Sequence, residues 1–102
     1  MAKRPTKDKK REALRALVAK WSEKIRVEPR VVRVQRMTRK WGSCSTNGVV
    51  TLSDELSSRP VNFQEYVIAH ELLHLRVKNH GKLFRASMGA YFPGWKEQDL
   101  QR

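Results

Sequence analysis

The sequence His70-Glu71-Leu72-Leu73-His74 constrains this chain more than any other feature. Two histidines four residues apart lie on one face of a helix, about 6 Å from each other, so their imidazoles can bind the same metal ion. The glutamate after the first histidine lies beside that metal without having to ligate it. The motif therefore predicts zinc on His70 and His74, with Glu71 as general base acting on a zinc-bound water.

The helix that carries this motif is expected to start at Asn62 and to continue to about Lys78. Asn62 as N-cap and Glu65 three residues later would form a capping box, with Val61 and Tyr66 as the accompanying hydrophobic pair. The alternative is a buried helix whose histidines only hydrogen-bond internally. Two histidines around a glutamate on a capped helix favour zinc.

A catalytic zinc ion usually has three protein ligands, and His80 is the leading candidate for the third. On a continuous helix His80 would lie about 9 Å beyond His74, so the chain must turn first. Asn79 and Gly81 favour such a turn. The rival ligands are the carboxylates of Glu97 and Asp99 on a later helix, but ligand chemistry and the turn residues favour His80.

Two strands are expected between the first helix and the motif helix. Residues 31–38 are rich in β-branched side chains and roughly alternate, and residues 48–52 form a second apolar run. Asn47-Gly48 is a strong turn signal, which favours an antiparallel pair. For Trp41 to Ser45 two interpretations stay open: these residues line a cleft, with Cys44 near the zinc, or Trp41 and Cys44 are core residues, which is favoured.

Three further helical segments complete the expected α+β domain. Residues 7–24 carry an apolar stripe at helical spacing, with Thr6 as N-cap. A second helix follows Gly81 and stops at Pro93-Gly94, and a last helical turn is expected at 95–100.

Composition limits the remaining possibilities. The chain of 102 residues is expected to be a single domain over 1–102, with a basic, flexible N-terminus at about 1–6. The absence of a long apolar run, a secretory signal and a second cysteine predicts a cytoplasmic monomer without membrane contact. The 22 basic and 10 acidic residues give a net charge of +12, which favours anionic partners such as nucleic acid.

Three segments, RKWGSCS at 39–45, YVIAHELLHL at 66–75 and NHGKLF at 79–84, resemble the YgjP-like metallopeptidase family, which is related to the SprT-like and minigluzincin zinc peptidases. The resemblance implies a minimal zincin fold: a small antiparallel sheet packed on an active-site helix and a backing helix, with zinc in a cleft beside the sheet edge. It also implies that His70, His74 and His80 ligate zinc and that Glu71 is the base.

We therefore expect a zinc-dependent peptidase acting on peptides or proteins, with an extended substrate pairing with a free sheet edge. Tyr66, Tyr91, Arg36 and Lys78 are candidates for stabilising the oxyanion. The alternatives are a nucleic-acid-binding module with structural zinc and a peptidase recruited to DNA by its basic surface. Structural zinc is usually held by four Cys or His ligands, whereas three histidines and a glutamate favour catalysis.

Overall fold

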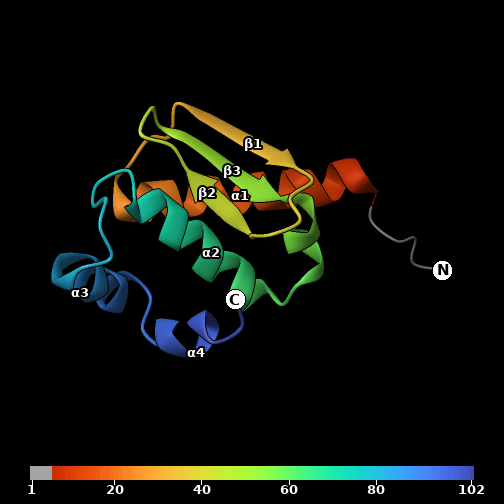
Figure 1. Cartoon of the computed structure of the whole chain (residues 1–102). Coiled ribbons are helices and arrows are strands. Elements are labelled where there is room, and N and C mark those ends of the chain that lie inside the picture. Colours follow the sequence, from red (N-terminus) through yellow and green to blue (C-terminus); the bar gives the residue numbers. More distant parts are fainter. Residues whose placement is uncertain (1–5) are drawn as a thin grey trace.

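Four α-helices, one 3-10 helix and three strands make up residues 6–102, the part of the chain described by the computed structural model (Figure 1). In chain order these are α1 (Lys7–Ile25), β1 (Val31–Gln35), β2 (Gly42–Cys44), β3 (Val49–Ser53), the 3-10 helix η1 (Asp54–Ser58), α2 (Val61–Leu73), α3 (Lys82–Tyr91) and α4 (Trp95–Asp99). The α+β class is as predicted. Apart from Thr6, the N-terminus predicted to be flexible lies outside the described residues.

The sheet is mixed, so the predicted antiparallel sheet is wrong. Its strand order is β1-β3-β2: β1 runs parallel to β3, with Val31 opposite Val49, and β2 runs antiparallel to β3. The predicted turn at Asn47-Gly48 exists, with Gly48 at φ 83°, but it joins β3 to β2. The strand β2 was not predicted, because three residues are too few to show an alternating pattern. The connection from β1 to β3 runs through β2 and is long enough for β1 and β3 to be parallel.

Helix α1 lies against both α2 and the sheet. Its predicted cap is confirmed, because the Thr6 hydroxyl accepts a hydrogen bond of 3.2 Å from the Lys9 amide. Among the side chains that connect it to its neighbours, Arg15 donates from Nη1 to the Val32 carbonyl of β1, and Trp21 donates from Nε1 to Glu65 Oε2 of α2, both at 2.9 Å. The apolar stripe of α1 packs into the core, as is usual for an amphipathic helix.

Helix α2 begins two residues earlier than predicted and without the capping box. Pro60 occupies the N-cap position and no side chain caps the helix. Glu65 is not available for a capping box, because its carboxylate binds Trp21 of α1 instead. The predicted hydrophobic pair is also absent, since Val61 is 57% exposed. Tertiary contacts therefore define the start of this helix where local capping does not.

Helix α2 is the centre of the molecule and is buried along almost its whole length. The sheet and α1 cover one side of it, and α3 and α4 contact the other (Figure 1). Packing on these two sides holds His70 and Glu71 in fixed surroundings. No helix within residues 6–102 combines the length and apolar character needed to cross a membrane.

Candidate metal centre

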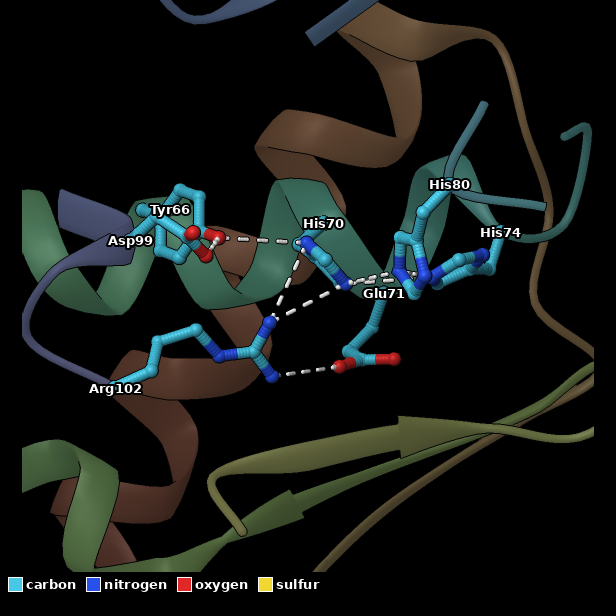
Figure 2. A network of polar contacts seen from close by, with 7 residues as sticks. All are labelled: Tyr66, His70, Glu71, His74, His80, Asp99 and Arg102. Carbon is cyan, nitrogen blue, oxygen red and sulfur yellow. Dashed lines mark hydrogen bonds and ion pairs between the residues drawn. The ribbon is translucent and has the colours of Figure 1, made fainter. Parts of the chain in front are cut away.

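Three imidazole rings meet at one point at the end of α2 (Figure 2). The Nε2 atom of His74 lies 3.2 Å from that of His70 and 2.9 Å from that of His80, and the Nε2 atoms of His70 and His80 are 3.1 Å apart. His70 comes from α2, His74 is the C-cap residue directly after it, and His80 comes from the loop before α3. The structure thus brings together the three histidines that the sequence singled out.

An early turn of the chain places His80 in this cluster. Helix α2 ends at Leu73, so the predicted continuation to Lys78 is wrong. The next three backbone amides, those of His74, Leu75 and Arg76, bond to carbonyls three residues back, which tightens the last turn. The His74 Nδ1 atom lies 3.1 Å from the Val77 carbonyl and holds the turn from inside. The chain then doubles back, and His80 faces the two helical histidines.

The aromatic ring of Phe84, on α3, packs against all three imidazoles. Its ring centroid lies 5.0 Å from that of His70, 4.6 Å from that of His74 and 4.9 Å from that of His80. Phe84 is only 2% exposed. An apolar ring in this place excludes water from one side of the cluster and restricts the ring orientations of the histidines.

Contacts on the far side of two imidazoles orient them. A carbonyl only accepts, so His74 donates from Nδ1 to Val77 and presents the lone pair of Nε2 to the cluster. His70 Nδ1 lies 3.5 Å from the Tyr66 hydroxyl, which in turn donates to the carboxylate of Asp99 on α4 (Figure 2). Tyr66 and Asp99 therefore link α4 to the position of His70.

Burial keeps these imidazoles neutral, which is the form that binds metal. Loss of hydration lowers the pKa of His70 to about 3, and the positive charge of Arg102 acts in the same direction. Burial also lowers the pKa of His74. Both histidines are therefore ready to coordinate a cation across the neutral pH range.

Glu71 lies beside the cluster and is 4% exposed. Burial raises the pKa of its carboxyl to about 7, although the positive charges of Arg102 and Lys40 oppose this rise. Its Oε2 atom is 3.8 Å from Arg102 Nη2, and Arg102 Nη1 is 3.3 Å from His70 Nε2 (Figure 2). Sequence reasoning missed Arg102, because nothing distinguishes one arginine after α4 among 22 basic residues.

Strand β2 passes directly beside Glu71, and Gly42 makes this approach possible. A Cβ atom on Gly42 would lie 3.0 Å from Glu71 Cγ, 3.3 Å from the Thr51 carbonyl oxygen and 3.3 Å from Val67 Cγ1. No real side chain fits at these distances without moving its neighbours. Gly42 therefore allows the strand and the motif helix to pack closely.

We expect Gly42→Ala to lower the free energy of unfolding by about 1–3 kcal/mol, the usual range for overpacking. Urea denaturation monitored by circular dichroism measures the change. Gly89→Ala is the matched control, because its added Cβ would meet only Trp95 Nε1, at 3.9 Å. That control should be neutral or stabilising, since alanine favours helix. Equal losses in both variants would contradict the role given to Gly42.

The structure combines the two interpretations of the segment after Lys40. Trp41 packs edge-to-face on Phe63, with ring centroids 5.5 Å apart, and is a partly buried residue packed against the core. Cys44 is partly buried but lines the cleft, and burial, followed by the charge of Glu71, raises the pKa of its thiol. A thiol with a raised pKa is a poor metal ligand at neutral pH.

The rival carboxylate ligands lie apart from the three histidines. Asp99 accepts a hydrogen bond from Tyr66, and Glu97 lines a separate depression beside Trp21. Neither belongs to the group of ligand atoms formed by the histidines, which lie within 4.8 Å of one another. Among the described residues, no other such group occurs.

An open cleft of about 830 Å³ runs past the histidines and Glu71, and residues of β2 line it. Of the four proposed oxyanion donors only Lys78 lines this cleft. Tyr66 is fully buried, Arg36 lines a depression near α1, and Tyr91 lines one near α4.

The donor set fits a single zinc ion. Zn–N bonds of about 2.0–2.1 Å in a tetrahedral site separate the ligand nitrogens by about 3.3 Å, close to the Nε2 separations of 2.9–3.2 Å. Lone pairs that face one another at these distances repel unless a cation lies among them. Three histidines with a fourth side open to a cleft are typical of catalytic zinc.

Comparisons with known proteins identify the family and the fold. The family described as YgjP-like, metallopeptidase domain, matches residues 1–101. Among solved structures, the metallopeptidase zymogens abylysin of Pyrococcus abyssi and jannalysin of Methanocaldococcus jannaschii both have a TM-score of 0.75 and 22% identity. Each match covers 86% of this chain and 90% or 91% of the other, and at this identity it establishes the fold. No curated protein matches the sequence.

Proposed function

The chain belongs to the YgjP-like metallopeptidase domain family, and we propose that it is a zinc-dependent peptidase with Glu71 as its general base. One observation carries the proposal: three Nε2 atoms lie 2.9–3.2 Å apart beside a buried glutamate, at the wall of an open cleft. A ligand set with an open side suits catalysis, whereas structural zinc sites are usually closed.

The residues divide the chemistry between them. Zinc held by His70, His74 and His80 would act as a Lewis acid that acidifies water and polarises a carbonyl. Glu71 takes the proton of the attacking water and later gives it to the leaving amine, and a pKa near 7 suits both steps. Arg102, 3.8 Å away, orients the Glu71 carboxylate by its charge.

The free edge of β2 supports binding of an extended peptide. Because β2 pairs with β3 on one side only, its other backbone edge is available within the described sheet. Gly42, Ser43 and Cys44 all line the cleft. A substrate that adds a strand here would run past Glu71 and the histidines, with main-chain hydrogen bonds giving affinity without strong sequence preference.

A chelation experiment tests the proposal. The purified chain should contain about one zinc ion and cleave an unfolded protein, and phenanthroline should abolish both cleavage and zinc content. Adding about one equivalent of zinc should restore cleavage. Cleavage that persists after zinc is removed, or a fully zinc-loaded chain that cleaves no unfolded protein, would contradict the proposal.

A further inference from the structure

Four exposed cations gather at the end of the cleft beyond His74. They come from two different segments: Arg26 and Arg30 from the loop between α1 and β1, and Arg76 and Lys78 from the loop after α2. These segments meet the β2–β3 turn at the same side of the molecule (Figure 1). Among the described residues, Glu28 and Glu71 are the only acidic residues that line the cleft.

None of these four side chains is paired with an acidic group within residues 6–102. Cations elsewhere do pair: Lys20 lies 3.4 Å from Glu65, and Arg11 lies 3.9 Å from Asp54. Unpaired like charges in a concave surface focus a positive potential there. This end of the cleft is therefore suited to an anionic ligand.

The backbone of Arg26 adds a second, independent observation. Arg26 has φ 62° and ψ 54°, the left-handed conformation at a helix end that glycine adopts without steric cost. Its amide already caps the Ser22 carbonyl, and its guanidinium makes no hydrogen bond within the described residues. The fold does not need an arginine side chain here, but the cleft receives its charge.

We propose that this end of the cleft binds acidic side chains, so that the substrates are peptides with Asp or Glu on one side of the scissile bond. The inference rests on the proposed peptidase function. An extended chain advances about 3.3 Å per residue. In a substrate paired with β2, the side chains that lie over the β2–β3 turn would therefore be those about two to four residues away from the scissile bond. Arginine binds carboxylates in bidentate geometry, which gives a preference for acidic residues.

A peptide fits this surface better than a nucleic acid does. Single-stranded nucleic acids bind grooves that combine positive charge with aromatic side chains on which bases stack. No Trp, Tyr or Phe among the described residues lines the cleft. The cations also share the cleft with the histidines and with the free strand edge, where a peptide would be cleaved.

Three fluorogenic peptides with the same central sequence test the inference: one neutral, one with glutamates on the N-terminal side and one with glutamates on the C-terminal side. At low salt, one acidic peptide should have a kcat/KM about 3- to 30-fold above that of the neutral peptide, as expected for a few exposed ion pairs. The advantage should largely disappear at about 0.5 M salt.

Matched double variants assign the preference to the cleft. Arg26→Gly with Arg30→Gln should remove the acidic advantage, and the glycine should not lower the melting temperature. Arg33→Gln with Arg85→Gln removes the same charge from exposed positions outside the cleft and should keep the advantage. Equal kcat/KM for all three peptides, or loss of the advantage in both double variants, would overturn the inference.

Two further measurements separate the possible failures. If the neutral peptide is cleaved without any acidic preference, the inference fails and the peptidase function stands. If nothing is cleaved, fluorescence anisotropy of labelled peptides decides: preferential binding of the acidic peptide that depends on Arg26 and Arg30 supports the inference, and equal binding overturns it. The inference would also be overturned if a labelled single-stranded oligonucleotide bound the chain, its binding depended on the same arginines, and the acidic peptide did not compete with it.

Discussion

Replacing Glu71 by glutamine is expected to slow peptide cleavage by about 10²- to 10⁴-fold while zinc content stays near one per chain. Glutamine keeps the size of the side chain but cannot accept the proton of the attacking water. Glu71 lies outside the group of converging nitrogen atoms, so its loss should not remove a metal ligand. The measurements are cleavage of an unfolded protein and zinc content by mass spectrometry under native conditions.

Glu65→Gln is the matched control for this variant. Glu65 lies on the same helix, but its carboxylate binds Trp21 and Lys20 of α1. The control should therefore keep both cleavage and zinc, with at most a small loss of stability. If Glu71→Gln cleaves as fast as the parent chain, Glu71 is not the base. If it loses zinc as well as activity, its role is in binding the metal.

The second large effect concerns the metal ligands. His70→Ala, His74→Ala and His80→Ala should each weaken zinc binding by at least about 100-fold, because a two-histidine site lacks the third bond of a tight one. Competition with a chromophoric chelator measures the affinity. Each variant should also lose the zinc-dependent rise in melting temperature that a metal bound only to the folded chain produces.

Glu97→Ala serves as the control, since Glu97 lines a depression away from the three histidines. Its zinc affinity should equal that of the parent chain. If Glu97→Ala weakened zinc binding and His80→Ala did not, the third ligand would be a carboxylate and the arrangement proposed above would be incorrect. Asp99→Asn is not a suitable control, because Asp99 is connected to His70 through the hydroxyl of Tyr66.

The local sequence determined the parts of this protein that depend on neighbours in the chain. The spacing of His70 and His74 follows from helical geometry, and the Thr6 cap and the Asn47-Gly48 turn each involve only a few residues. The family resemblance, which was recognised from three short segments of sequence, and the α+β class are also confirmed. His80 could be singled out because it is the one histidine besides the two in the motif.

Tertiary structure decided what depends on contacts between distant segments. The strand β2 forms only because β3 is beside it, and α2 starts at Val61 because Glu65 binds Trp21 and does not cap the helix. The contact of Arg102 with Glu71 joins residues 31 positions apart, and the cationic end of the cleft joins three loops. Such contacts arise from the packing of elements that sequence patterns describe only one at a time.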